Sequence, residues 1–109
     1  MIWTVPATVV RVVDADSVRA TLDLGFRVLF DANCRLAHCD APELTTVAGR
    51  LARDYVAALM PAGSPFTFVS HKLDKFGRPL GDIVLPDARD LATLLLELGH
   101  AKPYEGGAR

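Results

Sequence analysis

Residues 7–24 read ATVVRVVDADSVRATLDL, and this stretch decides the fold. Between residues 18 and 24, apolar side chains alternate with polar ones, which is the period-2 pattern of a strand with one face in water. Residues 7–13 form a β-branched run, and residues 14–17 have the composition of a tight turn. The stretch therefore predicts an antiparallel hairpin.

Three further β stretches follow this hairpin along the chain. Residues 26–39 begin with alternating apolar positions, contain a turn or bulge at residues 31–33, and continue as a strand over residues 34–39. Residues 66–70 and 80–85 are predicted as the last two strands, because each follows a segment that contains glycine. The count of predicted strands reaches five.

Two helices interrupt the β pattern. The first is predicted over residues 47–60, with Thr45 or Thr46 as N-cap and Pro61 as its stop. Its expected core face comprises Val47, Leu51, Tyr55, Ala58 and Leu59. The second helix begins after Asp90 and ends before Gly99. Its expected core face comprises Leu91, Leu94, Leu95 and Leu98.

This element order predicts a β-rich α+β fold. It is the order of a five-stranded OB-fold barrel with a helix between strands 3 and 4 and a C-terminal helix, which we rank ahead of a generic α+β roll. The length of 109 residues suits one domain over residues 1–109. Residues 105–109 are expected to be a poorly ordered tail because they contain a Gly-Gly pair.

Composition restricts the environment and the partners. Half of the residues are apolar and 23% are charged, which excludes a disordered chain, and no apolar run is long enough for a membrane span. Cys34 and Cys39 are too far apart in a strand to form a disulfide, so we expect free thiols. Without a secretory signal, the chain is expected to be cytoplasmic, and we assume a monomer. A net charge of −1 means that any nucleic-acid contact must be local.

The densest polar segment is RLAHCDAPE at residues 35–43. It combines Arg35 with the carboxylates of Asp40 and Glu43, and Asp16 and Arg78 supply the same residue types from other segments. Carboxylate oxygens suit Ca²⁺ or Mg²⁺, whereas the planar guanidinium suits a phosphodiester. These groups are the components of a metal-assisted phosphoryl site.

A straight strand would place Arg35 and Asp40 on opposite faces, because they are five residues apart. Both can serve one site only if the chain bends or bulges between Ala37 and Asp40. We therefore predict that bend.

Four motifs together resemble the staphylococcal (thermonuclease-like) nuclease family. They are VVDADS at residues 12–17, RLAHCDAPE at 35–43, DKFGR at 74–78 and LGHA at 98–101, and the match extends over about residues 9–104. The resemblance implies an OB-fold phosphodiesterase that cleaves DNA or RNA with little sequence preference and uses one Ca²⁺ ion. Each motif alone is weak, but their shared order and spacing are specific.

The resemblance also implies a role for each matching residue. The carboxylates of Asp16 and Asp40 and the backbone carbonyl of Ala41 would be the metal ligands. Glu43 would position or deprotonate the attacking water. The two arginines, Arg35 and Arg78, would bind the scissile phosphate.

Several of these residues have structural interpretations as well. Asp14 and Asp16 could cap their own turn, and Asp40 and Glu43 could be an Asx turn and a charge in the first turn of a helix. Asp14 is interpreted as structural, or as an outer neighbour of the metal. The corresponding alternative function is a non-catalytic OB-fold module that binds nucleic acid or a protein ligand.

The remaining candidates carry weaker signals. Lys72 and Lys75 could contact a phosphate backbone or belong to a solvated loop, and Tyr104 could stack on a base or pack internally. His38 precedes Cys39 and Asp40, but no second Cys/His pair at ligand spacing supports zinc, so we interpret His38 as an inward-facing core residue. His71 and His100 are interpreted as solvent or helix-end residues.

Overall fold

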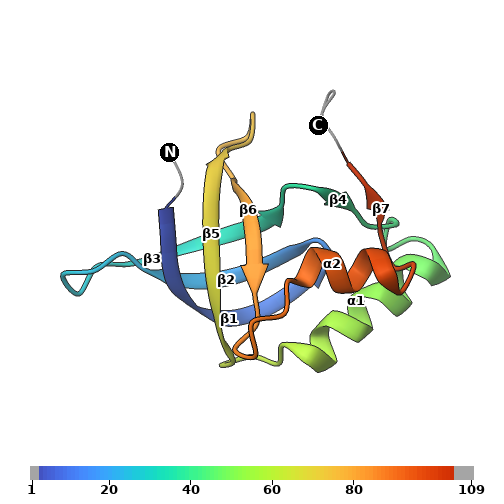
Figure 1. The fold of residues 1–109 in the computed structure, drawn as a ribbon, viewed down its shortest axis with the longest axis horizontal. Helices are drawn as coiled ribbons and strands as arrows, with labels where there is room; N and C mark the ends of the chain where they lie inside the picture. The colour runs from blue at the N-terminus through green and yellow to red at the C-terminus, as the bar shows by residue number, and fades with distance from the viewer. Residues whose placement is uncertain (1–2, 105–109) are drawn as a thin grey trace.

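A computed structural model of the chain describes residues 3–104, so the predicted tail at residues 105–109 lies outside the described residues. Five strands form a closed barrel in the order β1-β2-β3-β6-β5. Their bounds are Trp3–Asp14, Ser17–Asp23, Leu29–Leu36, Pro79–Val84 and Pro65–Leu73, respectively. All neighbours are antiparallel except β3 and β6, which are parallel. The predicted OB-type barrel is therefore confirmed (Figure 1).

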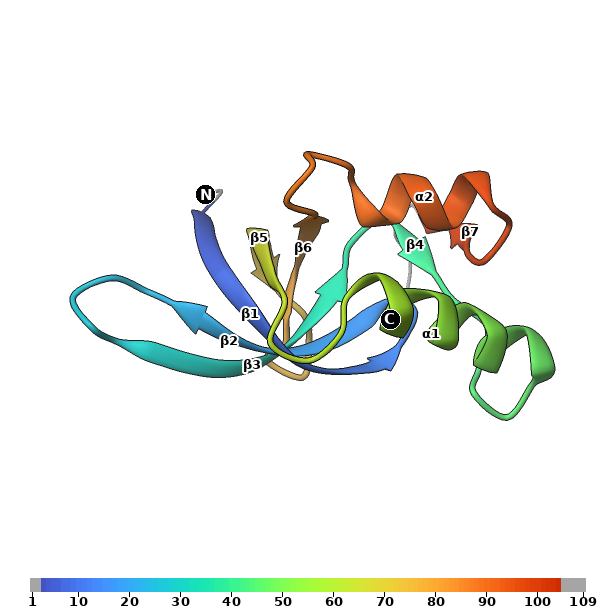
Figure 2. The ribbon, with the colours of Figure 1, turned by 90° about the horizontal axis from the view of Figure 1, so that it is seen from below.

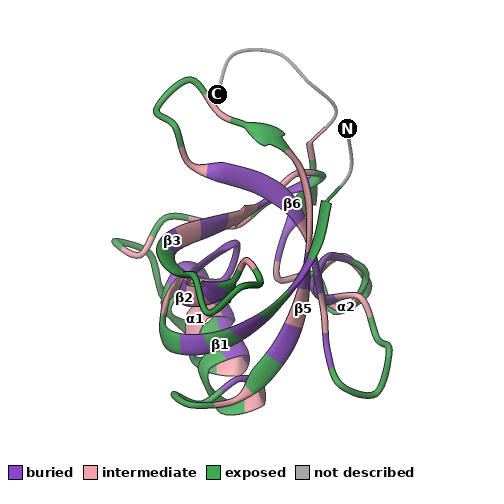
Figure 3. Ribbon diagram, turned by 90° about the vertical axis from the view of Figure 1, so that its left-hand side faces the viewer, coloured by how far each residue is buried: buried purple, intermediate pink, exposed green. Residues whose placement is uncertain are grey.

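The predicted first hairpin is formed by β1 and β2. Ala7 of β1 pairs with Leu22 of β2, and the pairing continues to Asp14 and Ser17 at the turn. The buried residues Val18, Ala20 and Leu22 point into the core, and the polar residues between them are more exposed, as the alternation predicted. Figure 3 shows buried and exposed segments following one another along the strands of the barrel.

The expectation for the third strand was wrong in two places. Residues 31–33 form no turn or bulge, because β3 is continuous there and Asp31 pairs with Thr21 of β2. The Thr21 hydroxyl donates to the Asp31 carboxylate at 2.9 Å across the two strands, which accommodates a polar residue in an exposed strand. The second error concerns the start of the strand: Phe26 and Arg27 lie in the turn between β2 and β3, where both have positive φ.

The helix α1, Val47–Leu59, begins at the predicted N-cap Thr46, and its predicted core face is only partly correct, because Tyr55 and Leu59 pack against the core but other members do not. Val47 and Leu51 are exposed, and the buried residues are Gly49, Ala52 and Val56. The side of the helix with the small residues Gly49 and Ala52 faces inward because the helix lies against the preceding loop. A Cβ on Gly49 would overlap the backbone carbonyl of Glu43. A bulkier stripe would hold the helix away from this loop.

The helix α2, Leu91–Glu97, matches its predicted signals closely. The carboxylate of Asp90 accepts a hydrogen bond from the backbone N–H of Thr93, and Gly99 ends the helix with φ of 75°. Leu91 and Leu95 are buried, whereas Leu98 is exposed, contrary to the predicted core face. Both helices lie at one end of the barrel, opposite the projecting β2–β3 hairpin (Figure 2).

A two-stranded sheet of β4, Cys39–Asp40, and β7, Lys102–Pro103, lies beside the barrel and was not predicted. Among the described residues, Cys34 and Cys39 form no disulfide, as expected, and burial raises the pKa of Cys34 to about 12. Within residues 3–104, no helix is both long and apolar enough to cross a membrane.

Candidate active site

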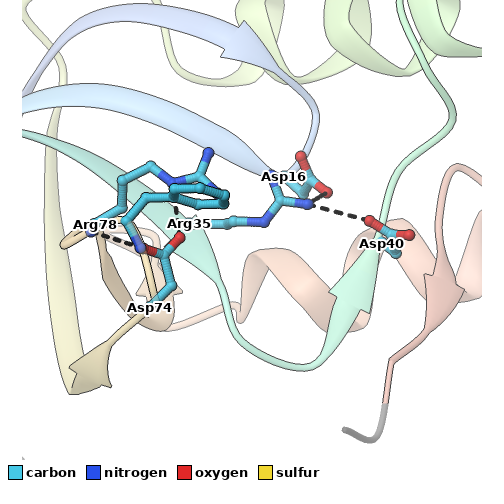
Figure 4. A network of polar contacts seen from close by, with 6 residues as sticks. Asp16, Arg35, Asp40, Asp74 and Arg78 are labelled. Carbon is cyan, nitrogen blue, oxygen red and sulfur yellow. Dashed lines mark hydrogen bonds and ion pairs between the residues drawn. The ribbon is translucent and has the colours of Figure 1, made fainter. Parts of the chain in front are cut away.

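One guanidinium joins two carboxylates at one edge of the barrel. The Arg35 Nη2 atom lies 3.3 Å from Asp16 Oδ2 and 3.2 Å from Asp40 Oδ1. Figure 4 shows Arg35 reaching toward both residues. Three residues that are distant in the sequence therefore meet at one point.

The hairpin turn positions Asp16. Ser17 pairs with Arg35 across β2 and β3, so the turn lies beside this arginine. The backbone N–H of Leu36 donates to the Asp16 carbonyl at 2.9 Å, and the N–H of Ala41 donates to its carboxylate at 3.0 Å. The Asp16 side chain is only 3% exposed, so these contacts replace the water it would otherwise bind.

The predicted bend positions Asp40. The strand β3 ends at Leu36, and residues 37 and 38 form a bend before β4 begins at Cys39. The backbone N–H of Ala37 donates to the carbonyl of Gly81, and Cys39 pairs with Pro103 of β7. These bonds fix the bend, so Asp40 returns to the side of the barrel that carries Arg35.

The site carries more negative than positive charge. Asp14, Asp16 and Asp40 are three carboxyl groups beside the single guanidinium of Arg35. Burial, followed by the hydrogen bond and charge of Asp16, raises the pKa of Asp14 to about 7, although Arg35 opposes the shift. Among the described residues, Asp14 Oδ1 and Arg35 Nε are buried without a hydrogen-bond partner.

This donor set fits a hard divalent cation. All of the side-chain acceptors are carboxylate oxygens, which Ca²⁺ and Mg²⁺ prefer. The buried acceptor of Asp14 adjoins the cluster, and the oxygens of Asp16 and Asp40 already contact a common cationic atom, Arg35 Nη2. A divalent ion at this point would offset the excess negative charge.

Glu43 lies on the loop between β4 and α1, next to this cluster. Glu43 is exposed, and its backbone carbonyl accepts hydrogen bonds from the backbone N–H and the hydroxyl of Thr46. A surface pocket is lined by residues from this loop and from the end of the chain, among them Asp40, Ala41, Glu43 and Lys102. Asp40 and the exposed Glu43 therefore line the same surface pocket.

Arg78 belongs to a second cluster, on the β5–β6 connection (Figure 4). Its Nε atom donates to Asp74 Oδ2 at 2.7 Å, and its guanidinium lies over the ring of Phe76. Asp74 Oδ1 accepts from the backbone N–H groups of Phe76 and Arg78. Burial opposes ionisation of Asp74, but these hydrogen bonds outweigh it and lower the pKa of its carboxyl.

The other predicted contacts are spread around these two clusters. Lys72 and Lys75 are exposed along the same hairpin as Arg78, and the Lys75 ammonium lies 5.2 Å from the Phe76 ring centre. Tyr104 is partly buried, and its backbone N–H donates to the carbonyl of His38. Contacts therefore join Asp16, Arg35, Asp40 and Ala41, whereas the contacts of Arg78 are with Asp74 and Phe76 on the β5–β6 connection.

Sequence reasoning missed the part played by Asp74. The signal was present, because an aspartate that precedes a glycine turn and is followed four residues later by an arginine can accept from both the turn and the guanidinium. The interpretation of His38 as an inward core residue was wrong, because it lies exposed in the bend.

Comparison with known proteins gives two similar sequences. No family model matches the chain. Two proteins, one from Escherichia coli O157:H7 and one from Escherichia coli, each carry the description "Uncharacterized endonuclease" and are 33% identical to this chain over 97 residues. The alignment covers 89% of this chain, but the chain spans only 60% of the length of either relative.

Proposed function

We propose that this chain is a calcium-dependent nuclease, a phosphodiesterase that hydrolyses DNA or RNA with little sequence preference. The observation that carries the proposal is the contact of Arg35 with both Asp16 and Asp40. The similarity to two proteins described as endonucleases supports the reaction class.

In the proposed mechanism, Asp16, Asp40 and the backbone carbonyl of Ala41 would hold the Ca²⁺ ion. When bound, the ion supplies positive charge for the phosphate in the transition state. The hydrogen bond from the Ala41 N–H keeps the Asp16 carboxylate turned toward Asp40. The buried position of Asp16 strengthens its attraction for a cation, since little water competes there.

Arg35 has two tasks in this mechanism. In the present arrangement it neutralises the two acidic side chains, Asp16 and Asp40. With Asp16 and Asp40 engaged in holding the ion, the Arg35 guanidinium would be available to donate its N–H groups to a non-bridging phosphate oxygen, for which its planar fork is suited. The contact is to phosphate rather than to a base edge, so it carries no sequence preference.

Glu43 is the proposed general base. Glu43 is exposed and lines the same pocket as Asp40, so a water molecule can reach it, lose a proton to it and attack phosphorus, while the P–O bond to the leaving sugar oxygen breaks and that oxygen takes a proton from solvent. Arg78 would exchange its partner Asp74 for the phosphate, and would stabilise the charge that grows there. That exchange keeps a charged partner on the guanidinium throughout.

Digestion of single-stranded DNA in Ca²⁺, and then in excess chelator, tests the proposal. We expect cleavage to require Ca²⁺, and to fall roughly 100-fold or more in Glu43→Gln and in Arg78→Ala. Arg53→Ala is the matched control, because Arg53 pairs with Asp54 on α1 and should leave the rate unchanged.

Two outcomes would contradict the proposal. Cleavage that persists in chelator, or that survives Glu43→Gln unchanged, would remove the mechanism. Tight binding of DNA without turnover, in protein that binds Ca²⁺ or does not, would instead identify the alternative, a non-catalytic nucleic-acid-binding module.

A further inference from the structure

A second group of metal-ligating side chains lies outside the proposed active site. His38 comes from the bend after β3, His71 from β5 and Asp82 from β6. One ligand atom from each lies within 4.8 Å of the other two. We propose that these three side chains form a binding site for a divalent transition-metal ion, Zn²⁺.

A β-bulge turns His71 toward Asp82. Ser70 pairs with Gly81 and Lys72 pairs with Leu80, so His71 is an additional residue on β5 with no partner position on β6. Bulges of this kind reorient a side chain relative to a regular ladder. The result is a distance of 3.0 Å between His71 Nε2 and Asp82 Oδ2.

Backbone hydrogen bonds bring His38 to the same place. The N–H group of Ala37 donates to the carbonyl of Gly81, which precedes Asp82, at 3.0 Å. The carbonyl of His38 accepts from the N–H of Tyr104, also at 3.0 Å. The bend is therefore attached to β6 on one side and to the end of β7 on the other, and the rings of His38 and His71 lie 5.6 Å apart between centres.

The ligand chemistry favours Zn²⁺ over Ca²⁺. Two imidazole nitrogens and one carboxylate oxygen suit Zn²⁺, which binds nitrogen at about 2.0–2.1 Å, whereas Ca²⁺ prefers oxygen ligands only. Tetrahedral coordination requires ligand atoms about 3.4 Å apart. The His71 and Asp82 atoms, 3.0 Å apart, are close to this spacing, and the His38 nitrogen lies within 4.8 Å of both, so a small approach of these side chains would enclose an ion.

Partial exposure of the group leaves room for an ion to enter. The His71 and Asp82 side chains are 27% and 30% exposed, and His38 is exposed. Three protein ligands leave a fourth coordination position for water. An ion there would link β5 and β6 to the bend that leads to Asp40, so Zn²⁺ should raise the thermal stability of the protein.

Titration of tag-free, chelator-treated protein with Zn²⁺ alone tests this site. We expect one ion per chain, and a loss of affinity in His38→Ala and in His71→Ala larger than the roughly 10–100-fold loss typical of outer neighbours of a metal. His100→Ala is the matched control, because the ring of His100 stacks on Tyr55 at 5.1 Å, away from the group. It should bind Zn²⁺ as the wild type does.

Substitution by Co²⁺ provides a readout that does not depend on affinity. We expect the visible absorption of four-coordinate Co²⁺ without a thiolate charge-transfer band, and we expect its loss in His38→Ala. His38 is exposed, so this variant should keep the fold, which circular dichroism can verify. Equal Zn²⁺ affinity in the wild type and His38→Ala, or a thiolate band from Cys39, would overturn the proposal whatever the nuclease assay shows.

Discussion

Asp14→Asn should stabilise the metal-free protein at high pH but not at low pH. Burial and the neighbouring Asp16 raise the pKa of Asp14 from 3.8 to about 7. Between about pH 4 and pH 7, the folded state therefore binds more protons at this group than the unfolded state does. The free energy of unfolding then falls as the pH rises through this window, and the deficit is complete above pH 7.

The size of this effect follows from the same shift. A rise from 3.8 to about 7 corresponds to about 4 kcal/mol if it acts fully on folding. Asp14 is only partly buried, so screening by solvent reduces the cost, and we expect about 1–2 kcal/mol. An asparagine keeps the shape of the side chain but carries no charge, so it removes the whole pH-dependent cost.

Urea denaturation in the presence of chelator measures this difference. The gain in free energy of unfolding from Asp14→Asn should be about 1 kcal/mol larger at pH 8 than at pH 5, because part of the cost is already present at pH 5. Asp54→Asn, on the exposed surface of α1, reports the effect of losing a carboxylate far from the site. A gain from Asp14→Asn that is identical at both pH values would refute the reasoning about its burial and its contact with Asp16.

Three further perturbations test other parts of the structure. Asp74→Ala should lower the free energy of unfolding, measured in urea, by about 1–3 kcal/mol, because it leaves the N–H groups of the turn and Arg78 without their acceptor. Since the pKa of the Asp74 carboxyl is lowered, this contribution is present above about pH 4 and is lost in stronger acid. Gly49→Ala should lower the free energy of unfolding by about 1–3 kcal/mol, although alanine has the better helix propensity, because the added Cβ would overlap the backbone of Glu43. The control Ala48→Gly should lower it only by the loss of helix propensity, about 1 kcal/mol. Arg35→Ala should lower the melting temperature in chelator, and added Ca²⁺ should restore part of it, because the buried Asp16 loses its cationic partner; equal melting temperatures for wild type and variant would contradict this.

Local patterns were sufficient for the elements that depend on neighbouring residues. The alternation in residues 18–24 predicted β2, and Asp90 and Gly99 predicted both ends of α2, because strand alternation and helix caps act within a few residues. The bend after Leu36 was also predictable, since the positions of Arg35 and Asp40 required it.

Features that depend on distant segments were not predictable in the same way. The larger apolar stripe of α1 contains Leu51, but the helix packs through Gly49 and Ala52 because the Glu43 loop approaches that side closely. Periodicity measures which residues are apolar, and it does not measure how closely another segment can approach. The same reasoning explains the error at residues 31–33, where a cross-strand partner at Thr21 accommodates Asp31.

The two candidate sites also differ in how far the sequence alone predicted them. Asp16, Arg35 and Asp40 were identified by residue type and motif order, and the fold brings them together. The group of His38, His71 and Asp82 has no sequence spacing of its own, because a bulge in β5 and a bend after β3 create it.

Calorimetric titration of the metal-free protein with CaCl₂ tests the central claim most directly, that one divalent cation binds between the first hairpin turn and β4. We expect one Ca²⁺ per chain in the wild type, and loss of that binding in Asp16→Asn and in Asp40→Asn, with unchanged binding in Asp54→Asn. Absence of heat in the wild type, or the same calcium affinity after either active-site substitution, would contradict the account.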